Sequence, residues 1–298
     1  MLPFNRDIDL FVMQGELHIE QSFALEQLSL YLQDLELMRS GAVYADIGIS
    51  QRRAASMPGI ITSQGRIISD PKVLKDPELT PSGSIAHLRL NGVMRSSDGA
   101  SSRGINSLID DINAANANPA IEGILLEVNT GGGEAIAGQM LQSAIGGSMK
   151  SIVVYGHMIA SAGIMATLTA DEVVASGDLA RFGSIGTFIT VDKYIQKWYN
   201  NYYEDIYADK SNNKNEEFRA YLNGDKGPLL KSVNKVNDAF LANVQKHREL
   251  KGDVEETLSG RLFLATDAKR RGLVDSIGNF NYAISRVDAN VRRRKKAM

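Results

Sequence analysis

The sequence predicts an α/β fold with a mostly parallel sheet, because short apolar runs alternate with stretches of helical spacing from Ser84 onward. The strand-like run 84–94 precedes a helical pattern over 107–119. A second apolar run, 121–128, leads through glycines into a helix that ends near Ile145, and a third, 151–156, leads to another helical pattern. Alternation at this spacing is typical of βαβ units.

The first third of the chain has a different texture. Leucines at three- and four-residue spacing predict one or two helices within residues 1–40. Residues 41–80 contain several prolines and glycines without a sustained period, which indicates a connecting segment. We therefore divide the chain into a helical arm and linker (1–80), a main domain (81–290) and a basic tail (291–298).

Composition excludes several classes of protein. The 298 residues are 43% hydrophobic and 23% charged, as in ordinary globular proteins, and the net charge of −2 argues against a general nucleic-acid binder. The basic run at 292–296 is expected to be a solvated, frayed tail. The chain has no cysteine, which rules out disulfides, thiolate chemistry and cysteine-based zinc sites.

Neither a secretory signal nor a membrane span is expected. Charged residues interrupt the N-terminal apolar stretch, and the best candidate span, 152–170, contains His, Ser, Gly and Thr and is shorter than the ~20 apolar residues required. We therefore expect a cytoplasmic location, which for a phage protein means the host cytoplasm or a virion precursor.

Two loops lie where the chemistry of a parallel sheet is expected. The glycine run 131–133 and Ser161 both follow strands, and ligands bind beyond the carboxyl ends of such strands. The sequence has no HExxH pattern, P-loop or dinucleotide fingerprint, so we predict no metal and no cofactor.

Ser161 stands among small residues, in Ala-Ser-Ala-Gly, where a strand turns into a helix. A hydroxyl at this place suits a nucleophile, but it also suits an ordinary helix cap. No histidine is a convincing base for it. We place His18 on the helical arm, His87 in a strand, His157 on the loop before the serine and His247 in a helical stretch.

A lysine kept neutral by burial is the remaining common base. A free lysine is protonated at pH 7, and full burial lowers its pKa by up to ~3–5 units. The candidates that follow the serine are Lys193, Lys197, Lys210 and Lys214. Lys210 stands at the end of the strand-like run 205–208, whereas Lys193 and Lys197 flank an amphipathic stretch. The alternative for each is a solvated surface charge.

Residues from about 84 to 285 resemble the serine–lysine peptidase family that includes signal peptide peptidase A and the head-maturation proteases of tailed bacteriophages. Several stretches match in order: LLEVNTGGGEA (125–135), IASAGIMATLTADEVVAS (159–176), FGSIGTF (182–188), IYADKS (206–211) and SGRLFLATDAKRRGLVDSIGNFNYAI (259–284). The resemblance implies the crotonase-like ββα superhelix that is shared with the Clp protease.

The resemblance also implies roles for individual residues. Ser161 corresponds to the nucleophile and Lys210 to the general base, with Lys214 as the fallback. Ser184 corresponds to a serine whose hydroxyl helps to hold the lysine amine. The backbone amides of Gly133 and Ala162 would form the oxyanion hole, and the substrate would bind along Gly132, Gly183 and Gly186.

Two positions depart from the family pattern. Gly131 replaces a proline, and Ala162 stands where many members have glycine, but neither change removes an amide donor. We explain the glycines at 132 and 133 by access, since a side chain there would keep a substrate backbone away from this edge.

The implied function is a serine endopeptidase that acts on protein or peptide substrates without a cofactor. Family members assemble as homo-oligomers, and in some the lysine reaches the serine of a neighbouring subunit. The form of the lysine segment and the lack of an anchor favour a prohead protease that acts on capsid or scaffold proteins, with the arm used for assembly. A membrane-associated signal peptide peptidase is the alternative.

Two other classes stay open. An acyl-CoA enzyme on the same fold would use the oxyanion turns with carboxylates as acid and base, for which Glu134 and Asp171 are the nearby acids. A non-catalytic assembly protein would keep the fold without the chemistry.

Overall fold

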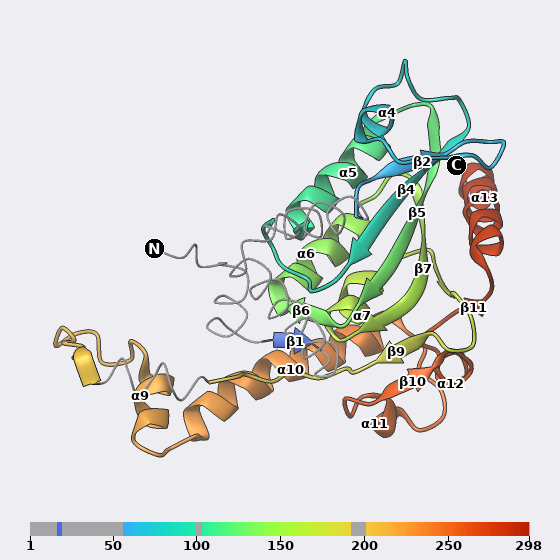
Figure 1. Cartoon of the computed structure of the whole chain (residues 1–298). Helices are drawn as coiled ribbons and strands as arrows, with labels where there is room; N and C mark the ends of the chain where they lie inside the picture. Colours follow the sequence, from blue (N-terminus) through green and yellow to red (C-terminus); the bar gives the residue numbers. More distant parts are fainter. Residues whose placement is uncertain (1–16, 20–55, 99–102, 192–200, 298) are drawn as a thin grey trace, which may run out of the picture.

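A long central sheet organises the computed structural model, which describes residues 17–19, 56–98, 103–191 and 201–297 (Figure 1). Its nine strands include the path β10-β9-β7-β5-β4-β2-β3, with β8 on β7 and β11 on β8. The strands are β2 (Gly59–Ile61), β3 (Ile67–Ile68), β4 (Ser84–Asn91), β5 (Ile121–Thr130), β7 (Ser151–Ala160), β8 (Glu172–Ala175), β9 (Arg181–Gly183), β10 (Leu262–Leu264) and β11 (Ser276–Ile277).

The centre of the sheet is parallel. β4 pairs with β5 and β5 with β7 in parallel register, and all three contain long runs of buried apolar residues, as strands covered on both faces do. β7 gives one edge to two partners, its first half to β8 and its end to β9. The α/β class expected from the sequence is confirmed.

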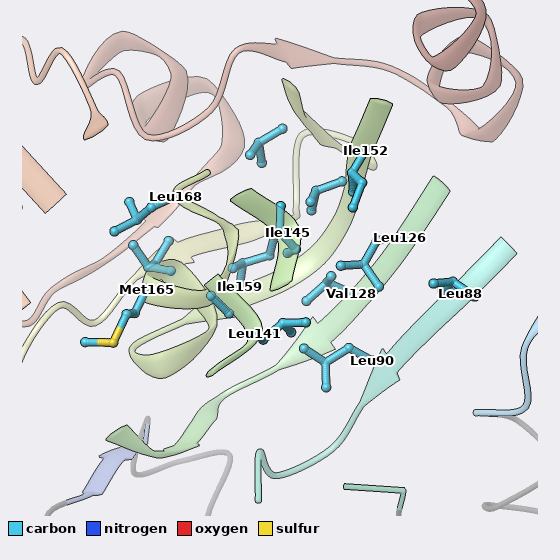
Figure 2. Close-up of a cluster of buried hydrophobic side chains, with 14 of the residues drawn as sticks. Leu88, Leu90, Leu126, Val128, Leu141, Ile145, Ile152, Ile159, Met165 and Leu168 are labelled. Carbon is cyan, nitrogen blue, oxygen red and sulfur yellow. The ribbon is translucent and has the colours of Figure 1, made fainter. Parts of the chain in front are cut away.

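Helices cover both faces of the sheet. On one face, α5 (Ile105–Ala117), α6 (Ala135–Gly146) and α7 (Ala162–Thr167) bury the larger core, which Figure 2 shows around Leu126, Leu141 and Ile159. On the other face, α13 (Phe280–Ala297) packs onto Leu125 and Val153. β5 leads through the short strand β6 (Gly132–Glu134) into α6, which is one ββα unit of the kind that the sequence resemblance implies.

The remaining helices lie around this body. They are α4 (Pro71–Lys75), α9 (Glu216–Leu222), α10 (Gly227–His247), α11 (Val254–Thr257) and α12 (Ala265–Arg270). α9 and the beginning of α10 extend away from the sheet (Figure 1). We call residues 201–230 the projecting arm. It exposes large apolar side chains, namely those of Ile206, Phe218, Leu222 and Leu230.

Two sequence expectations about the ends of the main domain differ from the structure. The presumed linker contributes β2 to the main sheet, where Ile60 is register partner to Ala86. The basic end is not a frayed tail, because α13 continues through it and Arg294 bonds Asp171 at 2.9 Å. Both differences arise from contacts between distant segments, which local composition does not reveal.

The helical arm expected in residues 1–40 lies almost wholly outside the described residues. Its described part, β1 (Leu17–Ile19), is a strand, so the placement of His18 on a helix is wrong. β1 pairs with the short strand β6 (Gly132–Glu134) in a separate two-stranded sheet. A strand partner overrides helical spacing here, because pairing supplies backbone hydrogen bonds that periodicity alone does not predict.

Candidate active site

Ser161 occupies a strained turn at the carboxyl end of β7. Its backbone has φ 56° and ψ −117°, a conformation that L-residues rarely adopt, and its N–H donates to the carbonyl of Gly183 at 2.9 Å. The hydroxyl makes no capping bond to α7, and its recorded partner is the carbonyl of Gly186 at 3.5 Å. The helix-cap explanation of this serine is therefore wrong.

The amides next to Ser161 begin a helix. Ala162 and Gly163 are the first residues of α7, so the helix offers their N–H groups no acceptor. The backbone of Gly138 in α6 packs so closely that a Cβ there would come within 2.9 Å of the Ala162 carbonyl. This packing holds the start of α7 in place beside β6, with which α7 is in contact.

The glycine turn, residues 131–133, lies against the backbone of Met94. The Met94 N–H donates to the carbonyl of Gly132 at 2.8 Å, and the Glu134 N–H donates to the carbonyl of Met94 at 2.9 Å. Gly133 has φ 156°, and a Cβ there would lie 2.0 Å from the Met94 carbonyl oxygen. Glycine at 133 is thus required by this close backbone approach, which corrects the explanation from substrate access.

Sequence reasoning missed the side chains that hold this turn. The Glu134 carboxylate accepts from the Ser96 N–H at 2.8 Å and from the Ser96 hydroxyl at 2.5 Å. The Thr130 hydroxyl donates to the Gly92 carbonyl at 2.6 Å and accepts from the Gly132 N–H at 3.0 Å. The bonds of Ser96 to Glu134 and of Thr130 to Gly92 join residues 38 positions apart, and no local pattern signals them.

Ser184 lies directly beside Ser161. β9 pairs with the end of β7 so that Gly183 is register partner to Ala160, and each serine is the next residue along its strand. Ser184 also has a positive φ, 51°, and its N–H donates to the Arg261 carbonyl at 2.7 Å. The structure therefore brings together the two serines that the sequence singled out.

The two candidate lysines that the structure describes, Lys210 and Lys214, make no contact with the serines in the single chain. Lys210 and Lys214 are exposed on the projecting arm, and neither hydrogen-bonds Ser161 or Ser184 within the residues that the structure describes. Lys193 and Lys197 lie outside the described residues. Burial lowers the pKa of Lys150, but this lysine lies just before the amino end of β7, where its amine donates to the Ala115 carbonyl in α5.

The two carboxylates that an acyl-CoA enzyme would use, Glu134 and Asp171, both accept hydrogen bonds from other residues, and Asp171 is far from Ser161. Asp171 accepts from the Ile152 N–H at 2.8 Å and from the Ser151 hydroxyl at 2.9 Å, at the start of the ten-residue β7. A strand of this length spans about 30 Å, so Asp171 cannot act beside Ser161. Glu134 is close to the glycine turn, where it holds Ser96.

Two histidines are bound to a single carboxylate on the sheet. Glu127 in β5 accepts from His87 at 3.0 Å and from His157 at 2.9 Å. The hydrogen bond from His87, followed by that from His157, outweighs burial and lowers the pKa of Glu127 to about 2. His157 lies within β7 and not on a loop, so its expected position is also corrected.

The fold and this edge define a class of protein: an α/β protein with a serine on a strained strand-to-helix turn beside a glycine-rich strand. Residues 146–293 match Peptidase family S49. The chain is thus a relative of these peptidases, and the resemblance to serine–lysine peptidases is confirmed.

Curated relatives support this assignment. Protease 4 of Haemophilus influenzae is 31% identical over 59% of this chain and 29% of its own length. Protease 4 of Salmonella typhi is 26% identical over 72% of this chain and 35% of its own. The chloroplastic serine protease SPPA of Arabidopsis thaliana is 25% identical over 63% and 29%. The chain thus spans about a third of the length of these relatives.

Two solved structures show weak similarity to this chain. A ClpP1 variant from Listeria monocytogenes is 12% identical, with a TM-score of 0.42 over 66% of this chain and 93% of its own. An enoyl-CoA hydratase from Mycobacterium avium is 16% identical, with a TM-score of 0.42 over 70% and 71%. Among the described helices, none is long and apolar enough to cross a membrane.

Proposed function

We propose that this protein is a serine endopeptidase in which Ser161 is the nucleophile and Lys210 the general base. The observation that carries the proposal is the Ser161 turn. Its backbone is strained, its hydroxyl caps no helix, and it lies at the edge of the sheet beside Ser184 and β6. The match to Peptidase family S49, which includes this turn, supports the same reaction.

In this mechanism a neutral lysine amine takes the proton of the Ser161 hydroxyl while its oxygen attacks a peptide carbonyl. The amides of Gly133 and Ala162 donate to the developing oxyanion, and losing one such donor typically costs about 2.7–4 kcal/mol. The ammonium then protonates the leaving amine, and water hydrolyses the acyl-enzyme. In this proposal the Ser184 hydroxyl holds the lysine amine.

We further propose that the dyad forms between two copies of the chain. Lys210 lies on the projecting arm, where Ile206 is 91% exposed and further apolar side chains are solvated. An apolar surface of this kind marks an interface. Docking of the arm on a second copy would bury it, and desolvation of an amine carried there favours its neutral form.

Complementation tests both parts of this mechanism. Ser161→Ala and Lys210→Ala should each hydrolyse fluorescent casein at least about a thousandfold more slowly than the wild type while remaining folded. Mixed under conditions of subunit exchange, the two inactive variants should recover about a quarter of wild-type activity by random pairing. Lys214→Ala is the matched control and should stay active.

Three results would contradict the proposal. Full activity of Ser161→Ala would remove the nucleophile, and full activity of Lys210→Ala would remove the base. Absence of recovery in a mixture shown by mass to contain mixed oligomers would place the dyad within one chain. Ile206→Asp should abolish both assembly and hydrolysis if the projecting arm forms the interface.

For the physiological substrate we propose capsid or scaffold proteins cleaved in the host cytoplasm during head maturation, because residues 206–211 resemble the lysine segment of the phage members. Mass spectrometry of the protein co-expressed with its genomic neighbours should show cleaved products that are missing with Ser161→Ala. Cleavage of signal peptides alone would favour the other branch of the family.

A further inference from the structure

The glycine strand of the candidate active site already has a partner from the N-terminal part of the same chain. β1 pairs antiparallel with β6, with Leu17 opposite Glu134, His18 opposite Gly133 and Ile19 opposite Gly132. The two strands lie side by side in Figure 1, more than a hundred residues apart in the sequence. No other described strand is in this small sheet.

We infer that residues 17–19 occupy the position of an extended substrate and keep the active site closed in the free protein. This inference rests on the proposed function. β6 then pairs with one extended segment at a time, either the N-terminal strand of this chain or the backbone of a polypeptide to be cleaved.

The direction of the β6 amides supports this assignment. The backbone of Met94 hydrogen-bonds both the carbonyl of Gly132 and the N–H of Glu134, so these two groups point to the same edge of β6. Successive amides of a strand alternate in direction, and the N–H and carbonyl of Gly133 therefore point to the opposite edge. His18 is the register partner of Gly133 on that edge.

The same amide is the one that the proposed mechanism assigns to the oxyanion. A substrate that binds along β6 would present its scissile carbonyl to the Gly133 N–H, and His18 stands at that register position. Addition of an extended chain to a free strand edge is a common mode of peptide recognition, with backbone bonds providing affinity. β1 uses this mode within its own chain.

The exposure of Ser161 agrees with a closed state. The residue is 1% exposed, so a substrate carbonyl reaches its hydroxyl only after part of the surrounding chain moves. A tethered strand acts at an effective concentration near the millimolar range, which a dilute substrate does not match. Displacement of β1 would then be the step that activates the protein.

The lack of cysteine allows a clean cross-linking test. Leu17 and Glu134 face each other next to the His18–Gly133 pair, at a position where antiparallel strands bring Cα atoms to about 4.5 Å, within the range for a disulfide. Leu17→Cys/Glu134→Cys should form an intramolecular disulfide with oxidised glutathione. Ile19→Cys/Glu134→Cys is the control, because its cysteines are diagonal to each other by register.

Activity is then compared within one variant. The oxidised Leu17→Cys/Glu134→Cys protein should cleave casein at least tenfold more slowly than its reduced form, with recovery on adding dithiothreitol. His18→Pro, which removes the N–H facing Gly133, should lower KM several-fold, whereas His18→Ala keeps the backbone pairing and should leave KM near the wild-type value.

Each result decides one part of the inference. Equal oxidation of the two cysteine pairs would show that β1 does not dock on β6. Preferential oxidation with equal activity of the oxidised and reduced forms would show that docking does not inhibit. Preferential oxidation of the Leu17→Cys/Glu134→Cys pair, together with wild-type protein that neither hydrolyses casein nor is labelled at Ser161 by a fluorophosphonate, would overturn the peptidase assignment and with it the inhibition, while the docking of β1 would stand.

Discussion

Ser161 and Ser184 follow two residues that are register partners, Ala160 at the end of β7 and Gly183 at the end of β9. Both serines have positive φ angles, 56° and 51°, and the Ser161 N–H donates to the Gly183 carbonyl at 2.9 Å. Two neighbouring strands thus turn at the same level, each with a serine in an unfavourable conformation. The surrounding sheet imposes this geometry, and the strain has a measurable cost.

The strain at Ser161 predicts a difference between two substitutions that both remove the hydroxyl. Ser161→Gly should be more stable than Ser161→Ala by about 1 kcal/mol, because glycine adopts positive φ without a Cβ penalty. Urea unfolding followed by circular dichroism measures this difference. Equal stability of the two variants would mean that the turn relaxes in solution.

Ser184 is a positioning residue in the proposed mechanism. Ser184→Ala and Ser184→Gly should both lower kcat about tenfold or more with little change in KM, because each removes the hydroxyl that holds the lysine amine. Ser184→Gly should also be the more stable of the two, for the reason given for Ser161. Ser176→Ala, beyond the end of β8, is the control. Retained kcat in both Ser184 variants would refute the role.

Gly133 combines a positive φ with a close backbone contact, and a matched glycine separates the two effects. Gly133→Ala would place a Cβ 2.0 Å from the Met94 carbonyl oxygen. Gly177 has nearly the same φ, 159° compared with 156° for Gly133, but a Cβ on Gly177 would have no atom within 4 Å. Gly133→Ala should lose about 1–3 kcal/mol more stability than Gly177→Ala, and about a hundredfold in kcat. Similar effects of both would show that β6 shifts without cost.

The Glu127 cluster predicts a pH-dependent contribution to stability. The pKa of Glu127 is about 2, below the ordinary 4.5, so its contribution is present above pH 4.5 and disappears as the pH falls towards 2. Glu127→Gln should lower the free energy of unfolding by about 2–3 kcal/mol at pH 7 and by progressively less below pH 4. Urea titrations at pH 7, 4 and 3 measure the difference.

A residue on the same strand serves as the control for this prediction. Glu122 is half-exposed and pairs with Lys295 at 3.0 Å, and such surface pairs contribute little. Glu122→Gln should therefore change stability by less than about 0.5 kcal/mol at each pH. A pH-independent effect of Glu127→Gln would indicate lost packing in place of a lost charge.

Arg294 should stabilise the fold without taking part in the reaction. Its guanidinium donates two 2.9 Å bonds to the Asp171 carboxylate and so holds α13 to the start of β7. Arg294→Ala should lower the unfolding free energy by about 1 kcal/mol, while Arg293→Ala, at an exposed neighbouring position, should not. Fluorophosphonate labelling of Ser161 should be unchanged in both. Equal stability of the two variants would show that the tail is dispensable.

Several local elements could be predicted from the sequence. Apolar runs of strand length separated by helical spacing indicated β4, β5, β7 and the helices between them, and the end of a strand at small residues indicated Ser161. These features depend on residues within one or two turns of each other, so periodicity is sufficient to find them. The serine at 184 came from a family motif and not from periodicity.

Contacts between distant segments decided the rest. The pairing of β1 with β6, the Ser96–Glu134 bonds, the approach of Met94 to Gly133 and the Arg294–Asp171 pair each join residues at least 38 positions apart. The exposed position of Lys210 is likewise a property of the projecting arm.

The sequence by itself determined that a parallel sheet would carry a serine and a glycine run at its carboxyl edge, because both follow from local spacing and strand direction. Only the tertiary structure decided which backbone lies along the glycine strand and that the lysine stands apart from the serine. Both depend on contacts between segments that are distant in the chain, and the free energy of such tertiary contacts is not determined by any short stretch of sequence.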